Sequence, residues 1–426
     1  MAKPRTKKRQ EHERESDPWF NPYRTPATPA ALEVVGAVLL DLEKREVRKR
    51  ARKKEDRNWL WRVGHVLVAN LAYHCLSGSP GNGLVVPRAK RELGKKSRYH
   101  PPYFTRSFPK LLDTLQRLGY LRQKKGAFSG KPGHSKRTTI QADACFIELV
   151  KKHQVTFEDL EVSEAEEVII LKRAKRGHWD EGGPIEYEDT TLTRKLRAEL
   201  REFNSWLEGA DIVFDPDAHD RPVDVRARRL YRYFAGDFKS GGRLFRGFWQ
   251  NLPKPARLLG LRIQGEPVIE LDYAQLNPML AYAKVGRPPP SGDAYTLPGL
   301  EDQRDGVKKV FNALLFDKGP RDRFPKGVNV HFPKTKVGDV IGAIREKHSM
   351  IGWLLSSGAG FDLMFRESEI MMRVLEHLRR KAIVGLPVFD AVIVKASDAE
   401  AAMAVMKDQF KKAAGMEIEV RLERAP

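Results

Sequence analysis

Cysteine is scarce in this sequence, since its 426 residues include only Cys75 and Cys145. Two cysteines cannot build a disulfide framework or a four-cysteine zinc site, which favours a reducing compartment, and we expect a cytoplasmic protein. No stretch approaches the roughly 18–20 apolar residues that a membrane helix needs, so no membrane partner is expected. Residues 1–19 lack the apolar core of a signal peptide and are expected to form a disordered basic tail.

Familiar nucleotide-binding and hydrolase motifs are missing as well. The sequence has no Walker A phosphate loop, no GxGxxG fingerprint and no nucleophile elbow. Histidines at metal-binding spacing are also lacking. The sequence therefore does not support a P-loop ATPase, a Rossmann dehydrogenase, a serine hydrolase or a His-rich metal site.

Acidic residues are few relative to basic ones. Lys and Arg number 77 against 56 Asp and Glu, which gives a net charge of +21 and a pI of about 9.8. This excess favours a polyanionic partner, most often nucleic acid, although it could serve solubility alone. Residues 88–137 hold 15 basic and two acidic residues, a net charge of +13. A second basic run, 44–57, lacks an apolar stripe and predicts a solvated helix.

Residues 58–150 combine this charge with a distinctive order of elements. Apolar periodicity predicts one helix over 58–76 and another from Phe108 to Leu118, with Gly119 as its stop. Two short strands then flank a basic, Gly-rich loop. Helices followed by a basic hairpin resemble a winged helix-turn-helix domain. Such a domain could instead contact protein.

Winged-helix domains lay one helix in the major groove and press the hairpin onto the DNA backbone. The resemblance therefore implies duplex DNA as a partner. The candidate phosphate contacts are Arg106, Lys110, Arg117, Lys124, Lys125, Lys131, Lys136 and Arg137.

The middle of the chain, 151–235, is expected to be a helical linker or a thumb-like region. Leucines and Phe203 at helical spacing predict a helix from Thr191 to Glu208. Its arginines share one face, which is either a solvated surface or a contact with duplex DNA. Residues 225–236 predict a further basic helix that stops at Gly236.

Two aspartates lie in apolar strands of the C-terminal half. Asp272 ends the strand "EPVIELD", and Asp390 stands in the middle of "LPVFDAVIVKAS". A carboxylate buried among apolar residues is costly unless a cation offsets it. Two such acids on adjacent strands could hold two Mg²⁺ ions, with Mn²⁺ as a substitute. Alternatively, Asp272 is a solvent-exposed strand end and Asp390 a hairpin turn residue. A hairpin turn is also compatible with a metal site.

A predicted helix over 302–319 lies between these strands. Arg304, Lys308, Asn312 and Phe316 recur every four residues along one face, while apolar residues fill another. Lys308 could neutralise a triphosphate as a point charge, and Arg304 could fork onto its oxygens. The alternative is an ordinary amphipathic helix.

These pieces, in this order, resemble the palm and fingers of family A DNA polymerases and of single-subunit, phage-type RNA polymerases. "DYAQLN" is similar to motif A, with matches at Asp272, Tyr273 and Gln275, and Asn277 at the sugar-selecting position. Motif B is matched by Arg304 and Lys308, with Asn312 and Phe316 replacing its aromatic residues. "FDA" matches motif C at Asp390.

A further match lies upstream, in "GGRLFRGFWQNLPKPAR" over 241–257. The resemblance implies that Arg243 approaches the primer terminus, and that Gln250 and Asn251 contact the primer-template. Asn277 replaces the glutamate that helps DNA polymerases to exclude the ribose 2′-hydroxyl. Phe389 and Ala391 replace the residues that flank the motif C acid. These departures leave the choice between deoxy- and ribonucleotides open, with a lean toward dNTPs or weak discrimination.

The sequence also has the look of palm proteins carried by plasmids and phages, some of which couple polymerisation to priming. The expected function is a template-directed nucleotidyltransferase, most simply a small DNA polymerase acting on primer-template and nucleoside triphosphates. A replication accessory protein or helicase is a further expected partner. The alternatives are a replication initiator or regulator with an inactive palm, and a primase or RNA polymerase that uses rNTPs.

The expected fold is α+β, with a helical fingers insertion in an antiparallel palm sheet. The expected domains are a basic tail and helix at 1–57, a winged helix at 58–150, a linker or thumb at 151–235, and palm and fingers at 236–426.

Overall fold

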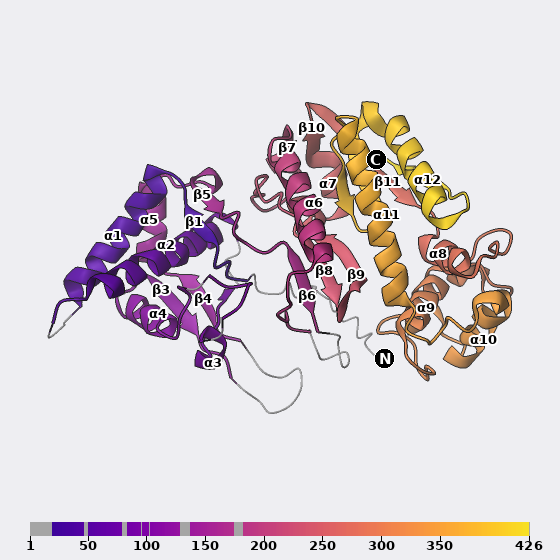
Figure 1. Ribbon diagram of the computed structural model, residues 1–426, viewed down its shortest axis with the longest axis horizontal. Helices are drawn as coiled ribbons and strands as arrows, with labels where there is room; N and C mark the ends of the chain where they lie inside the picture. The colour runs from indigo at the N-terminus through magenta and orange to yellow at the C-terminus, as the bar shows by residue number, and fades with distance from the viewer. Residues whose placement is uncertain are drawn as a thin grey trace, which may run out of the picture. The chain divides into compact units, whose positions relative to one another are not determined.

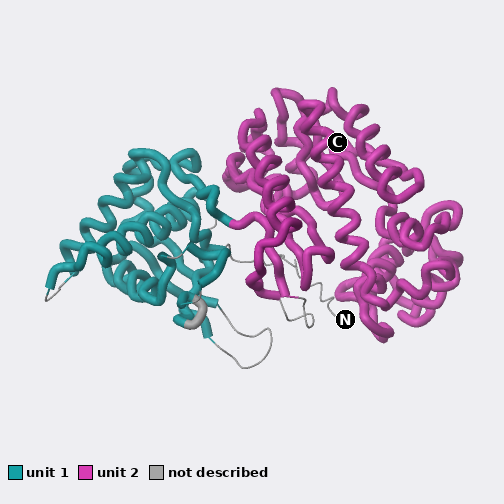
Figure 2. The backbone as a smooth tube through the Cα atoms, viewed as in Figure 1, with its two compact units in different colours: residues 1–166 teal, residues 167–426 magenta. Residues whose placement is uncertain are grey.

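The computed structural model describes residues 19–46, 50–78, 83–94, 96–101, 103–127, 137–173 and 182–425. The chain divides into two compact units, 1–166 and 167–426, drawn teal and magenta in Figure 2. Both units combine helices with largely antiparallel sheets, so the α+β class expected from the sequence is confirmed. Among the described residues, no helix is both long and apolar enough to span a membrane.

Unit 1 packs its helices against one small sheet (Figure 1). Strand order in this sheet is β2-β4-β3, all antiparallel, and β1 pairs separately with β5. The helices are α1 (Pro29–Arg45), α2 (Lys54–Leu76), α3 (Lys90–Leu93), α4 (Phe108–Arg117) and α5 (Ala144–Lys152). The strands are β1 (Arg24–Pro26), β2 (Leu84–Val85), β3 (Leu121–Lys124), β4 (Thr139–Ala142) and β5 (Leu160–Val162).

Helix α4 follows from its sequence. Pro109 stands in its first turn, where a missing N–H costs no hydrogen bond. Phe108, Leu112 and Leu115 are fully buried on one face. Gly119 follows the helix with φ +84°, a conformation that glycine adopts without the penalty of a Cβ.

The basic helix expected over 44–57 is not formed as such. Helix α1 ends at Arg45, Glu46 is extended, and α2 begins at Lys54. Closely spaced like charges repel one another along a helix face. In contrast, Glu55 and Asp56 lie in the first turn of α2, where acids stabilise the positive end of the helix dipole.

Unit 2 contains a six-stranded sheet, in the order β12-β13-β11-β10-β7 with β14 also on β11. Its strands are β7 (Ile212–Phe214), β10 (Leu261–Ile263), β11 (Glu266–Tyr273), β12 (Leu386–Val388), β13 (Ala391–Lys395) and β14 (Val420–Glu423). A second, three-stranded sheet has the order β6-β8-β9. It consists of β6 (Ile169–Lys172), β8 (Tyr231–Ala235) and β9 (Asp237–Phe245).

Helices α6, α7, α11 and α12 pack on these sheets, whereas α9 and α10 lie beside them (Figure 1). Helix α11 contacts β9 and α12, and α12 also contacts β11, β13 and β14. The helices are α6 (Thr191–Glu208), α7 (Lys254–Gly260), α8 (Leu276–Val285), α9 (Arg304–Phe316), α10 (Val337–Lys347), α11 (Gly360–Arg380) and α12 (Ala399–Ala414). Seven short 3₁₀ turns among the described residues complete the elements. They are η1 (Phe157–Asp159), η2 (Pro216–Ala218), η3 (Phe248–Asn251), η4 (Glu301–Gln303), η5 (Asn329–His331), η6 (Ser349–Ile351) and η7 (Ala396–Asp398).

The basic helix expected over 225–236 is wrong, because residues 225–230 are not helical and the residues from Tyr231 to Ala235 form strand β8. β8 pairs in parallel with β6 and antiparallel with β9. Its aromatic residues favour a strand, and pairing on both edges satisfies its backbone groups. The helix expected from Thr191 to Glu208 is confirmed as α6. The middle of the chain is therefore mixed α/β rather than helical.

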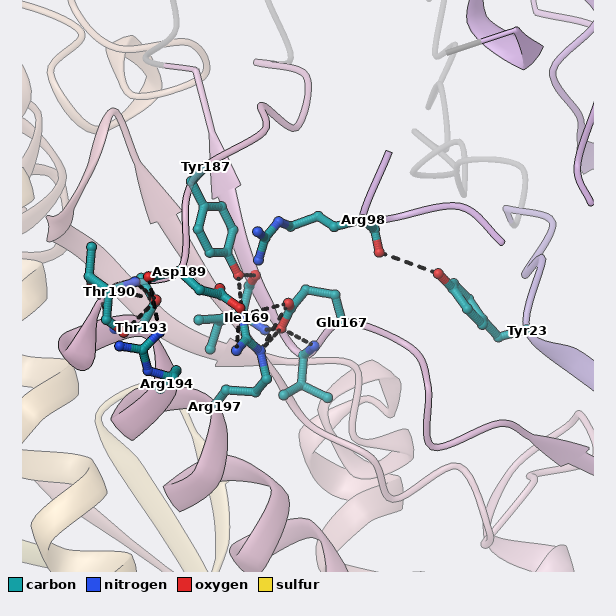
Figure 3. Close-up of polar contacts among 11 residues, drawn as sticks. Tyr23, Arg98, Glu167, Ile169, Tyr187, Asp189, Thr190, Thr193, Arg194 and Arg197 are labelled. Atoms are coloured by element: carbon teal, nitrogen blue, oxygen red, sulfur yellow. Dashed lines mark hydrogen bonds and ion pairs between the residues drawn. The ribbon is translucent and has the colours of Figure 1, made fainter. Parts of the chain in front are cut away.

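Unit 2 begins with a polar cluster around the buried carboxylate of Glu167 (Figure 3). The Glu167 carboxylate accepts hydrogen bonds from the N–H groups of Val168 and Ile169, at 3.0 and 3.2 Å. Arg197 of α6 donates to Glu167 and to Asp189. This cluster fixes α6 against the start of β6.

Candidate active site

Strand β11 carries Asp272 next to the β12–β13 hairpin. Asp272 pairs with Ala391 of β13, and Val388 pairs with the same Ala391 across the hairpin. Phe389 and Asp390 are therefore the two residues of a tight turn. Directly opposed residues in an antiparallel pair have Cβ atoms about 4.5–5.5 Å apart. Asp390 directly precedes Ala391, the residue that pairs with Asp272. The fold therefore brings the two aspartates to neighbouring positions on adjoining strands.

The turn itself is strained. Phe389 has φ +57°, which is unfavourable for a bulky side chain, and 40% of its surface is exposed. Its ring packs edge-on against Phe245 and lies 5.4 Å from the Arg243 guanidinium. These contacts hold the turn, and with it Asp390, in one position.

The two carboxylates repel one another in a partly dehydrated site. Burial, and then the charge of Asp390, raises the pKa of Asp272 to about 7. Burial likewise raises the pKa of Asp390, against the opposing effect of Arg243 and Lys308. Lys308 is the cation that acts on both acids.

Glu270 lies two residues before Asp272 and so on the same face of β11. It is buried, and Arg257 donates to one of its oxygens at 2.8 Å while Lys254 contacts the other at 3.0 Å. These two cations occupy the carboxylate. Glu270 therefore has its own counter-ions, while its charge still contributes to the raised pKa values of Asp272 and Asp390.

The acid pair fits a hard divalent cation that is completed by a substrate. Within the described ranges, no group of three or more His, Cys, Asp or Glu side chains could hold a metal ion. Mg²⁺, however, is usually bound through one or two carboxylates plus substrate phosphates and water. Two coupled carboxylates with raised pKa values supply the negative charge that such an ion would neutralise.

Helix α9 presents its predicted stripe toward the acids only in part. Lys308 is exposed, and no ion pair to it occurs among the described residues. Arg304 instead donates to Asp293 at 2.6 and 3.1 Å and lies over the Tyr295 ring. Lys308 is thus available to an incoming anion, whereas Arg304 already has a carboxylate partner.

Asn277 of α8 and Asn312 of α9 meet directly. The Asn277 amide donates to the Asn312 amide oxygen at 3.0 Å. Asn312 stands one helical turn after Lys308, on the same face of α9. The structure therefore places this amide pair beside the exposed cation.

Three other predicted nucleotide contacts have structural partners. Tyr273 is buried, donates to the Met406 carbonyl at 2.7 Å, and points to the sheet face opposite Asp272. The Gln275 side chain accepts from the Ala294 N–H at 2.5 Å. Phe316 packs edge-on against Phe361 of α11. The structure does not bring Tyr273 to the acids.

The upstream residues approach the same hairpin from β9 and η3. Arg243 forms a two-pronged ion pair with Glu367 of α11, at 2.5 and 2.6 Å, and its charge also acts on Asp390. Gln250 donates to the Pro387 carbonyl at 2.9 Å, which fastens η3 to β12. Asn251 is exposed at the end of η3.

In unit 1, the described candidates for phosphate contact are all exposed. They are Arg106, Lys110, Arg117, Lys124, Lys125 and Arg137. Lys110 and Arg117 belong to α4, and Lys124 ends β3. Lys131 and Lys136 lie outside the described residues.

Sequence reasoning missed several residues that shape this site. Asp293 forms an ion pair with Arg304, and Glu367 forms one with Arg243. Glu270 forms ion pairs with both Lys254 and Arg257. Buried Tyr295 packs against Phe311 of α9. Burial raises the pKa of its hydroxyl, and the charge of Asp390 raises it further. Of these residues, only Glu270 could have been singled out from the sequence, because it is an acid within an otherwise apolar strand.

No protein-family model and no curated protein matches this chain. A solved structure that is similar to it is the POL domain of Pol1 from M. smegmatis, in complex with DNA primer-template and dNTP. The TM-score is 0.29 and the identity is 10%, over 93% of this chain and 66% of that one.

Proposed function

We propose that unit 2 is a template-directed nucleotidyltransferase, most simply a small DNA polymerase. The observation that supports this best is the coupled pair Asp272 and Asp390 on adjoining strands, with exposed Lys308 acting on both. Paired carboxylates next to an unpaired cation suit a substrate that carries both a metal and a polyphosphate.

Each side chain of the site has a proposed role. Asp272 and Asp390 would hold Mg²⁺, or Mn²⁺ as a substitute, and the bound ion would supply Lewis-acid activation of a hydroxyl and charge stabilisation for pyrophosphate. Lys308 would neutralise the triphosphate. Arg304 would reach a phosphate only by exchanging its partner Asp293. Arg243, fixed by Glu367, would approach the primer end beside the hairpin.

The nucleotide sugar would lie near Asn277, Asn312 and Phe316. The two amides can donate or accept hydrogen bonds, and Phe316 lacks a hydroxyl. An amide pair is a weaker barrier to a ribose 2′-hydroxyl than a carboxylate would be. We therefore propose that this site uses dNTPs or discriminates weakly between dNTPs and rNTPs.

Unit 1 is proposed to be a winged-helix domain that grips duplex DNA. Its order α2-β2-α3-α4-β3-β4, with β2 paired to β4, supports this interpretation. The exposed basic residues of α4 and β3 support a DNA partner.

Primer extension tests the catalytic proposal. Wild type, Asp272→Asn and Asp390→Asn are compared on a primed template with Mg²⁺ and each nucleotide set. We expect incorporation by wild type and losses of at least about 1,000-fold in both variants. Glu266→Gln is the matched control, because Glu266 lies at the other end of β11 and binds Ser397.

Incorporation that is absent, or that survives in both aspartate variants, would sink the enzyme proposal. An inert protein that still binds duplex DNA would favour a replication initiator or regulator with an inactive palm. Synthesis from rNTPs without a primer would favour a primase or RNA polymerase.

A further inference from the structure

An open, basic groove lies in unit 2, in the segment that follows α9 and at the first turn of α10. Its volume is about 720 Å³, and its walls are formed by residues 322–327, Asn329 and residues 336–339. None of the residues assigned above to the acids, the triphosphate or the sugar belongs to these walls. We refer to it as the 322–339 groove.

The groove wall contacts, through Phe332, the face of α9 that is opposite Lys308. Phe324, in the groove wall, stacks on Phe332 with ring centroids 5.0 Å apart and planes 5° apart. Phe332 in turn packs against Gly306. With 3.6 residues per turn, Gly306 and Lys308 lie on nearly opposite faces of the helix. The 322–339 groove is therefore separate from the acid site.

Cations predominate in and around this groove. Arg323, Lys326 and Lys336 line it, together with the acids Asp322 and Asp339. Arg323 is 86% exposed and only 3.6 Å from Asp322. Lys326 and Lys336 are exposed, and no ion pair involves them within the described part of the chain. Residues 318–347 contain eight Lys or Arg against three acids.

Two glycines leave the backbone open in the groove wall. A Cβ added at Gly327 or Gly338 would meet no atom within 4 Å. Gly327 also has φ +75°, which favours glycine. A strand of ligand could thus approach the main chain closely at both positions, while Phe324 offers a partly exposed ring.

From this combination we infer that the 322–339 groove binds single-stranded nucleic acid. Proteins that bind single strands combine a positively charged groove for the backbone with aromatic rings for the bases. A groove of about 720 Å³ has room for a few nucleotides, and an aromatic ring can stack only on bases that are not already stacked within a duplex. The inference does not rest on the proposed catalysis, because binding needs neither metal nor nucleotide.

The first test measures affinity. Lys326→Ala/Lys336→Ala is compared with Lys381→Ala/Lys407→Ala, a matched loss of two exposed lysines elsewhere in unit 2. Binding of a fluorescent oligo(dT) to the full chain is followed by anisotropy as salt is varied, without Mg²⁺. We expect the groove variant to bind about 10- to 30-fold more weakly near 0.1 M salt, with a log–log salt slope shallower by about 1.4. The control should bind like wild type.

The second test is local, so that binding by unit 1 cannot mask the result. Oligo(dT) carrying 4-thiothymidine is photo-cross-linked to the full chain, and the attached peptides are identified by mass spectrometry. We expect cross-links within residues 322–339 that a duplex of equal length or excess ATP does not compete away.

Cross-links absent from these residues, or equal affinity losses in the groove and control variants, would overturn the inference. Competition by ATP would overturn it in favour of a mononucleotide site. A wild-type protein that extends a primer but gives no cross-links in residues 322–339 would overturn the groove inference alone. A protein that gives these cross-links but does not extend a primer would overturn the proposed catalysis alone.

Discussion

Lys308 is the exposed cation whose charge reaches both Asp272 and Asp390. Its neighbour Lys309 points elsewhere and lies 3.0 Å from His331. Adjacent residues on a helix are about 100° apart, so the two lysines offer the same charge to different surroundings. Substituting each lysine in turn therefore shows whether activity depends on the position of the charge or only on its presence.

We predict that Lys308→Ala lowers kcat/KM for the incoming nucleotide by about 100-fold, because a charge placed on the phosphates is lost. Lys309→Ala should retain activity close to wild type. Steady-state primer extension over a range of nucleotide concentrations measures both. Equal losses in the two variants would remove Lys308 from the proposed nucleotide site.

The Asn277–Asn312 pair decides the sugar preference in this proposal. We predict that Asn277→Glu increases the ratio of dNTP to rNTP incorporation by about tenfold, since a carboxylate at this position would repel and crowd a 2′-hydroxyl. Single-nucleotide incorporation with matched dNTP and rNTP measures the ratio. Asn58→Glu, at an exposed residue of α2 in unit 1, controls for the added charge. An unchanged ratio in Asn277→Glu would place the sugar elsewhere.

At the scale of elements, strand β9 is fastened to helix α11 by Arg243 and Glu367. Glu367 is only 2% exposed, and its pKa is raised by burial despite the opposing effect of Arg243. A buried carboxylate that loses its partner is left uncompensated. This ion pair fixes β9 to α11, and with β9 the guanidinium that lies against Phe389 of the β12–β13 hairpin.

We predict that Arg243→Met destabilises the protein by about 3–5 kcal/mol. The double variant Arg243→Met/Glu367→Leu should recover much of that loss, because it leaves no buried charge. Urea unfolding, followed by circular dichroism, gives both free energies. A double variant that is as unstable as the single one would show that the ion pair contributes shape rather than charge compensation.

In unit 1, Arg88 lies three residues after β2 and contacts α4 and β3. Its guanidinium donates to both oxygens of Asp113, at 2.9 Å each, and Gln123 donates to the same carboxylate. Hydrogen bonding from Arg88 holds the pKa of Asp113 below its usual value, against the opposing effect of burial. A lowered folded-state pKa stabilises the fold above the unfolded value of about 3.9.

We therefore predict that Asp113→Asn lowers stability by about 1 kcal/mol at pH 7, a value reduced by the exposure of this carboxylate. The difference from wild type should shrink as the pH falls below about 4, because wild-type Asp113 then becomes protonated. Thermal unfolding of both proteins at pH 7 and pH 3 measures this stability difference. In an Arg88→Ala background the pH dependence of the difference should become smaller, because only Gln123 and Lys125 then lower the pKa of Asp113. An undiminished pH dependence would contradict this assignment.

At the scale of the whole molecule, charge and chemistry are divided between the units. Residues 1–166 hold 34 Lys and Arg against 19 Asp and Glu, a net charge of +15, which leaves +6 for residues 167–426. Most of the attraction for duplex DNA should therefore come from unit 1, whereas the coupled acids belong to unit 2.

We predict that a fragment of residues 1–166 retains the salt dependence of duplex binding. Six exposed candidate contacts imply a slope of about −5 in log affinity against log salt. Anisotropy titrations of the full chain and the fragment measure this slope, after circular dichroism has established that the fragment is folded. A steep slope that appears only with residues 167–426 would move the duplex contact to unit 2.

The sequence by itself determined the elements that local pattern encodes. The strand ending near Asp272, the hairpin around Asp390, and helices α6 and α9 follow from apolar spacing and from helix stops within each segment. The order of the acids along the chain was equally visible.

Only the tertiary structure decided which charges remain available. Asp293 holds Arg304, Glu367 holds Arg243, and Lys254 with Arg257 holds Glu270, while Lys308 stays exposed. These partners come from separate elements, and no local periodicity specifies which of them meet. The strand β8 was misjudged for the same reason, because its pairing with β6 and β9 outweighs its helix-like basic pattern. Packing between distant segments therefore selected the site from among the candidate residues.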